Sequence, residues 1–93
     1  MHAIFVEVNA DDSVIDKARE ELPKTAVPMA QANGAKAGYW LAAQGGRGVS
    51  VVVFDSEVKA REAAANMKPA EPAGTVPGVT FMTVEVREVL ASL

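Results

Sequence analysis

The sequence predicts an α+β sandwich, in which two helices cover one face of a four-stranded sheet. Three observations carry this prediction. First, periodic segments follow one another in the order strand, helix, strand, strand, helix, strand. Second, the segment Val49 to Phe54 is almost wholly apolar and rich in β-branched residues, which is typical of a strand buried on both faces in mid-sheet. Third, right-handed crossovers bring both helices to the same face of such a sheet.

The composition excludes several classes of protein. The 93 residues allow one domain, residues 1–93. Without cysteine there is no disulfide or thiolate metal site, and a single histidine, His2, excludes a histidine-rich metal cluster. A net charge of −3 argues against a nucleic-acid partner, which requires a basic face. No segment approaches the ~20 apolar residues of a membrane span and no signal peptide is visible, so we expect no membrane partner and a cytoplasmic location.

The first strand, His2 to Val8, alternates between an apolar face and a mixed face. The apolar face carries Ile4, Val6 and Val8, and the mixed face carries Ala3, Phe5, Glu7 and Asn9. The helix that follows has one apolar stripe, formed by Val14, Ile15, Ala18 and Leu22. Pro23 removes a backbone donor and is expected to kink or divide this helix near Leu22. Asn33-Gly34 is a stop signal, because glycine tolerates the left-handed conformation that ends a helix.

The second and third strands are predicted to form a hairpin. Ala35 to Ala43 is the second strand, and the glycine-rich turn Gln44 to Gly48 leads directly into Val49 to Phe54. Asp55-Ser56 then caps a second helix, from Glu57 to about Met67.

The last part of the chain combines a long connection with a strand. Residues 68–78 contain three prolines and either cover the mouth of a cavity or form a passive span. The last strand, Val79 to Val86, is expected to place its residues alternately on two faces: Met82, Val84 and Val86 on one, and Phe81, Thr83, Glu85 and Arg87 on the other.

This order of elements is that of the ferredoxin-like βαββαβ sandwich, with a four-stranded antiparallel sheet and two helices on one face. Crossover handedness predicts that the first and third strands lie side by side in the middle, with the second and fourth strands at the edges. We expect the two central strands to run parallel to each other.

The face of the sheet opposite the helices has no cover within the chain. We expect it to carry Phe5, Glu7, Asn9, Val52, Phe54, Phe81, Thr83 and Glu85, with either Tyr39 or Trp40. Because such side chains are too apolar to stay exposed as one surface, a second copy is the economical cover. The sequence therefore predicts a homodimer whose sheets pack face to face. The alternative is a monomer that keeps this face for another partner.

With this architecture the chain resembles the dimeric α/β-barrel superfamily, and within it the small proteins grouped with antibiotic-biosynthesis monooxygenases. The resembling segments are residues 3–8, Pro28 followed by Gly34, Gly38-Tyr39-Trp40-Leu41, and residues 53–57 at the start of the second helix. The resemblance covers nearly the whole chain as an order of elements. It implies a dimeric barrel, but none of the segments is a catalytic signature, and fold-level likeness does not choose among the activities of the superfamily.

Departures from the superfamily narrow what the resemblance implies. Its haem-degrading enzymes combine a strand asparagine, which Asn9 matches, with a tryptophan on the second helix and a histidine beyond it. The second helix here has neither, so the resemblance argues against haem, and no cofactor or metal is predicted. Its quinone monooxygenases surround the substrate with Asn, Trp, Tyr and Arg side chains, and the substrate itself supplies the carbanion that reacts with oxygen. Side chains of these types are present at Asn9, Tyr39, Trp40, Arg47 and Arg87.

Seven side chains are candidates for a ligand site: Phe5, Asn9, Tyr39, Trp40, Phe54, Phe81 and Glu85. Asn9, Trp40 and Glu7 are the candidates for a catalytic role. Tyr39 and Trp40 are neighbours in one strand and face opposite ways, so only one of them can line a cavity. Glu7 and Glu85 can act as a base if an apolar cleft raises the pKa of either carboxyl; otherwise both are solvated or paired with Arg87.

Two functional hypotheses follow. In the first, the homodimer binds a small, mostly apolar molecule in a cavity between sheet and helices, and oxidises it without metal or cofactor. In the second, the protein is a non-catalytic dimeric interaction or ligand-sensing module, and the face of the sheet is only an interface. Under the second hypothesis, Tyr39 and Trp40 serve only in packing and contact no ligand.

Overall fold

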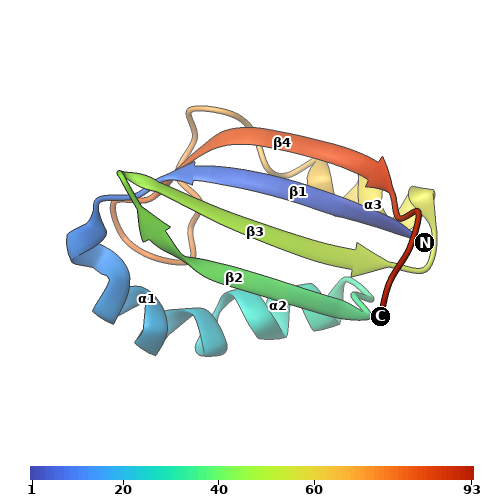
Figure 1. Ribbon diagram of the computed structural model, residues 1–93, viewed down its shortest axis with the longest axis horizontal. Coiled ribbons are helices and arrows are strands. Elements are labelled where there is room, and N and C mark those ends of the chain that lie inside the picture. Colours follow the sequence, from blue (N-terminus) through green and yellow to red (C-terminus); the bar gives the residue numbers. More distant parts are fainter.

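The computed structural model describes all 93 residues and has the predicted βαββαβ order (Figure 1). The four strands, β1 (His2–Asn9), β2 (Ala37–Gln44), β3 (Arg47–Phe54) and β4 (Thr80–Glu88), form one sheet in the order β2-β3-β1-β4. The helices are α1 (Ile15–Glu21), α2 (Ala26–Ala32) and α3 (Glu57–Ala64), with short 3₁₀ turns at Asp12–Val14 and Leu22–Lys24. None of the helices is long and apolar enough to cross a membrane. The predicted fold class is confirmed.

All neighbouring strands are antiparallel, so the expectation of a parallel pair at the centre is wrong. The reason is topological. The crossover through α1 and α2 makes β1 and β2 run the same way, and the hairpin makes β3 run opposite to β2. Because β3 lies between β1 and β2, it opposes both of them. The hairpin turn is two residues long, and both glycines, Gly45 and Gly46, have positive φ, as the tightest hairpin turns require.

Pro23 divides the first helical region as predicted. α1 ends at Glu21, Pro23 lies in the 3₁₀ turn Leu22–Lys24, and α2 follows. α2 ends at the C-cap Asn33, and Gly34 has a φ of +87°, which is the left-handed conformation expected there.

The main core lies between α3 and the centre of the sheet. Its buried side chains are Ile4, Val6, Val52, Phe54, Ala60 and Ala63. Phe54 and Ile4 are the largest of the fully buried side chains. A second buried cluster, formed by Ala10, Val76 and Val79, lies where the loop before β4 meets the end of β1. By contrast, α1 has no buried residue, and the only buried residue of α2 is Ala26.

The other face of the sheet, called the open face here, is not covered by any helix. It carries Ala3, Phe5, Glu7, Asn9, Tyr39, Leu41, Arg47, Val49, Val51, Val53, Thr83, Glu85 and Arg87. Val52 and Phe54 were expected on this face, but both lie in the core on the helix side. Their partners across β1 are Ile4 and His2, and paired residues share a face.

Phe81 also lies on the helix side rather than on the open face. The register between β1 and β4 shifts between Glu7 and Val8, so that Val8 pairs with Phe81 and Met82 is the extra residue of a β-bulge. A bulge interrupts the alternation of faces. As a result Phe81 packs against the core, while Met82, expected on the face opposite to that of Phe81, is 40% exposed.

The N-terminus of α3 holds a small charged cluster. The Ser56 hydroxyl accepts a hydrogen bond from the Lys59 N–H at 3.2 Å, which confirms the predicted cap. One residue on, the Glu57 carboxylate accepts a 2.8 Å hydrogen bond from Arg61 and lies 3.9 Å from the His2 imidazole. The bond and charge of Arg61, with a smaller contribution from His2, lower the pKa of Glu57 below its ordinary value of 4.5.

This lowered pKa predicts a pH dependence of folding. Because the carboxylate is favoured in the folded state, its stabilisation is complete above a pH of about 4.5 and is lost as the pH falls through the lowered pKa. We expect Glu57→Gln to remove this part of the acid destabilisation in urea unfolding curves recorded at a series of pH values from neutral to acidic. Glu62→Gln, on the same helix and without an ion pair, is the control and should leave the slope of the unfolding free energy against pH unchanged. Equal slopes for both variants and the wild type would contradict this account.

Candidate functional site

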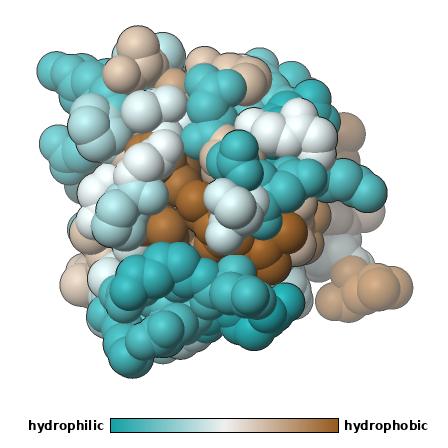
Figure 2. Space-filling view, turned by 90° about the vertical axis from the view of Figure 1, so that its left-hand side faces the viewer, coloured by the Kyte–Doolittle hydropathy of each residue, from teal (hydrophilic) through white to brown (hydrophobic).

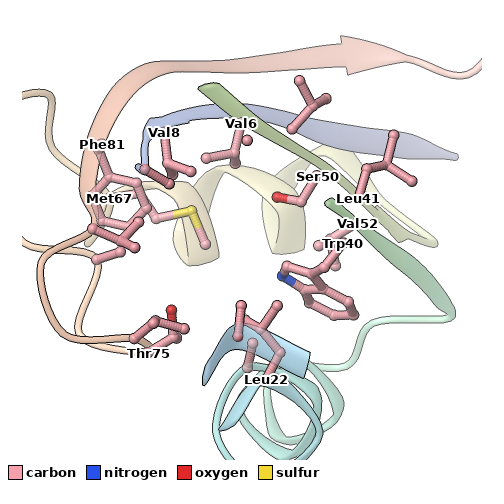
Figure 3. Close-up of a pocket in the computed structure, with 18 of the residues that line it drawn as sticks. Val6, Val8, Leu22, Trp40, Leu41, Ser50, Val52, Met67, Thr75 and Phe81 are labelled. Carbon is pink, nitrogen blue, oxygen red and sulfur yellow. The ribbon is translucent and has the colours of Figure 1, made fainter. Parts of the chain in front are cut away.

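A pocket of about 360 Å³ lies between the sheet and the helices α1 and α2 (Figure 3). Its walls come from the helix side of the sheet (Val6, Val8, Trp40, Ser50, Val52 and Phe81), from the first helical region (Val14, Ile15, Ala18, Leu22 and Ala30), and from the chain after α3 (Met67, Thr75 and Val76). Of the 31 lining residues, 24 are hydrophobic. Arg19 is the single charged residue among them, so the pocket is an apolar space with few polar groups.

The pocket opens to the surface at one end of the sandwich. Figure 2 views the molecule from the end where α1 begins and the β2–β3 hairpin turns, and it shows hydrophobic side chains at the bottom of a hollow. Hydrophilic groups surround this hollow, most densely at the bottom of the view, at the level of α1. A small molecule can therefore reach the apolar walls from solvent.

The pocket exists because the first helical region stands off the sheet. The apolar stripe predicted for α1 does face the sheet, since Val14, Ile15, Ala18 and Leu22 all line the pocket. None of these four residues is buried, however. The stripe thus forms a wall of an open space, and Val14, Ala18 and Leu22 also pack against the small cluster of Ala10, Val76 and Val79.

The loop between α3 and β4 closes another side of the pocket. Its backbone is fixed to β4 by two hydrogen bonds, from the Ala70 N–H to the Phe81 carbonyl and from the Phe81 N–H to the Glu71 carbonyl. A third, from the Ala73 N–H to the Val79 carbonyl, holds the loop to the residue just before β4. The Thr25 hydroxyl, at the start of α2, lies 3.2 Å from the Thr75 carbonyl of the loop and 2.9 Å from the Glu21 carbonyl. The segment is thus a wall of the pocket, since Pro72, Ala73, Thr75 and Val76 line it, and not a passive span.

Trp40 is the aromatic residue of β2 that faces the pocket. Tyr39 points to the open face and is 67% exposed. Gly38, two residues before Trp40 on the same face, leaves the space that the indole occupies. A Cβ atom at Gly38 would lie 2.9 Å from the indole ring, which is too close for any real contact. The orientation of Trp40 thus depends on a glycine at position 38.

The structure does not bring the seven predicted ligand residues together. Trp40, Phe54 and Phe81 line the pocket. Phe5, Asn9, Tyr39 and Glu85 lie on the open face, on the other side of the sheet. The predicted residues therefore belong to two separate surfaces, and only the first group can contact a molecule in the pocket.

The two carboxylates considered as bases are paired on the open face. The Glu7 carboxylate, only 16% exposed, lies 2.9 Å from the Arg47 guanidinium. Glu85 accepts hydrogen bonds of 3.1 Å from Arg87, whose guanidinium also lies 6.0 Å from the centre of the Phe5 ring. Arg87 is thus the partner of Glu85, as the sequence suggested, whereas Glu7 pairs with Arg47 instead. Neither carboxylate can reach the pocket.

Ser50 lines the pocket but is not among the residues predicted for the site. It is the single polar residue in the run from Val49 to Phe54, and this break in the apolar pattern was the available signal. Met67, Thr75 and Val76 also line the pocket. The helix predicted to reach about Met67 ends at Ala64, so all three come from an irregular segment whose path no local pattern determines.

Comparison with known proteins supports the fold and carries no function. No protein-family model matches the chain, and no curated protein matches it. Among solved structures, the chain is similar to the crystal structure of a protein of unknown function from Nitrosomonas europaea, with a TM-score of 0.61 and 20% identity. The similarity covers 99% of this chain and 91% of that one. The small α+β fold with a four-stranded antiparallel sheet is thus shared.

Proposed function

We propose that this protein binds a small, mostly apolar molecule in the pocket between the sheet and α1–α2. The observation that carries the proposal is an open apolar space of about 360 Å³ where domains usually have a close-packed core. Known ligand pockets have volumes of about 300–1,000 Å³, mostly apolar walls and few polar groups. A dry apolar cavity of about 150 Å³ is enough for benzene, so this pocket has room for a molecule of two rings.

The geometry supports binding better than oxidation. The resemblance to antibiotic-biosynthesis monooxygenases suggests a substrate that loses a proton and then reacts with oxygen as a carbanion. The residues that line the pocket include no Asp, Glu, His, Lys or Tyr to accept such a proton. A substrate oxidised here would have to ionise without a base from the lining. Binding is therefore the function proposed.

The binding proposal predicts that filling the pocket abolishes binding. Trp40 is the single tryptophan and lines the pocket, so its fluorescence should change when the two-ring hydrocarbon indane is added. Ala18→Phe places a ring in the pocket and should weaken indane binding by at least about tenfold, because the ligand and the ring compete for the same volume. Fluorescence titration measures this, and native mass spectrometry of fresh protein tests for a molecule that copurifies.

The matched control is Glu20→Phe, which adds the same ring to an exposed position of the same helix. It should bind indane as the wild type does. Saturable binding that survives Ala18→Phe would put the ligand elsewhere, and wild-type protein that binds no indane would overturn the proposal.

We also propose that the open face pairs with the open face of a second copy. Tyr39 and Leu41 are 67% and 60% exposed there, beside the side chains of Val49, Val51 and Val53. The charges on this face are balanced, since Glu7 pairs with Arg47 and Glu85 pairs with Arg87. A face without net charge and with an apolar centre can meet its own copy without repulsion, as a twofold dimer requires. This pairing is independent of the pocket, which lies on the other side of the sheet.

A further inference from the structure

We infer that the pocket selects a neutral ligand that carries one hydrogen-bonding oxygen, such as a cyclic ketone or alcohol, through the indole N–H of Trp40 and the hydroxyl of Ser50. The inference rests on the proposed binding function. It adds to that function the two polar groups that recognise the ligand and the chemical class of ligand that they accept.

The register of the sheet brings these two groups together. Trp40 of β2 and Ser50 of β3 are directly paired, so their side chains lie side by side on the helix face. On its other side Ser50 is paired with Val6 of β1. In Figure 3 the indole nitrogen and the serine oxygen both face the space between the sheet and Leu22. The polar pair thus sits in the middle of an apolar wall.

Both groups are free to bond a ligand. The protein forms no hydrogen bond with the Ser50 hydroxyl or with the Trp40 indole N–H. Neither is a fully buried atom without a partner, so both reach the open space of the pocket. An indole N–H only donates, whereas a hydroxyl donates or accepts. Together they can donate to both lone pairs of one carbonyl oxygen, or bond the donor and the acceptor of one alcohol.

The charges around the pocket favour a neutral ligand. Arg19 is the charged residue of the lining, and its guanidinium is held 2.7 Å from the Asp16 carboxylate on the exposed side of α1. The other polar side chains of the lining are those of Asn33 and Asn66, which are exposed, and Thr75. A ligand carboxylate beside Ser50 would lose its hydration without gaining a cation, which is costly.

Three probes on the same two-ring scaffold test this inference: indane, 1-indanone and indane-1-carboxylate. Ser50→Ala should weaken 1-indanone binding by about 3- to 10-fold, the net value of one hydrogen bond, and leave indane binding within about twofold. Trp40→Phe should also weaken binding, by a larger factor for the ketone than for indane. The carboxylate should bind the wild type at least about tenfold more weakly than the ketone does. Isothermal titration calorimetry measures all three, because it does not depend on tryptophan.

Thr83→Val is the control, since it removes a hydroxyl from the open face and should change neither affinity. The ratio of ketone to indane affinity is the readout, because a general loss of packing would change both probes alike. A ratio that Ser50→Ala and Trp40→Phe leave unchanged would overturn the inference while the binding function stands. So would a carboxylate that binds as tightly as the ketone. If none of the three probes binds the wild type, both the binding function and this inference fail.

Discussion

The substitution Phe54→Ala is expected to lower the free energy of unfolding by about 3–5 kcal/mol, the cost of removing a buried aromatic ring from a core. Phe54 is 1% exposed and packs in the main core, together with Ile4 of β1 and Ala60 of α3. These neighbours belong to regular elements that cannot move in to close the gap. Small domains are stable by only about 5–15 kcal/mol in total, so the loss should be plain in urea unfolding curves.

Two further variants make the experiment decisive. Phe54→Leu retains most of the buried volume and should fold well, with a smaller loss than the alanine variant. Phe5→Ala removes the same ring from the open face and should cost much less in the isolated chain, because Phe5 is not buried there. Equal losses for Phe5→Ala and Phe54→Ala would mean that the two rings are equally buried, and would contradict the placement of Phe54 in the core and of Phe5 on the open face.

The faces of the sheet were predictable where the sequence alternates and unpredictable where it does not. In β1 the alternation of Ile4, Val6 and Val8 with Phe5 and Glu7 assigned both faces correctly. In β3 nearly every residue is apolar, so the pattern contains no information about which valines face the helices. The register fixed by the hairpin turn decides it. In β4 the pattern was regular, but a single bulge residue reversed the face of everything before it.

The pocket was predictable only in part. The stripe on α1 and the pair Tyr39-Trp40 were visible in the sequence, and a cavity between sheet and helices was among the hypotheses. Yet the same stripe fits a helix packed tightly on the sheet and a helix that stands off it. The difference lies in how far α1 and the loop around Thr75 are held from the sheet, and this distance depends on long-range contacts such as the one between Thr25 and Thr75.

Replacing Val51 with glutamate is expected to weaken the proposed homodimer by at least about 100-fold, because like charges and unpaired carboxylates in an interface cost several kcal/mol. Val51 lies at the centre of the open face, between Phe5 of β1 and Tyr39 of β2. A carboxylate there would be buried against the apolar centre of the partner. The nearby cations are already used, since Arg47 pairs with Glu7 and Arg87 with Glu85. Sedimentation equilibrium over a range of protein concentrations measures the dissociation constant.

The control Val58→Glu makes the same replacement on α3, where the side chain is 65% exposed and lies away from the open face. It should leave the dissociation constant unchanged. A wild-type chain that sediments as a monomer at every concentration would exclude the second copy as the cover of this face. In the isolated chain Val51 is not fully buried, so Val51→Glu should reduce only the part of the stability that depends on protein concentration. Phe54→Ala should reduce stability at every concentration. The two variants together therefore distinguish the helix side of the sheet, which stabilises the single chain, from the open face, which is the proposed dimer interface.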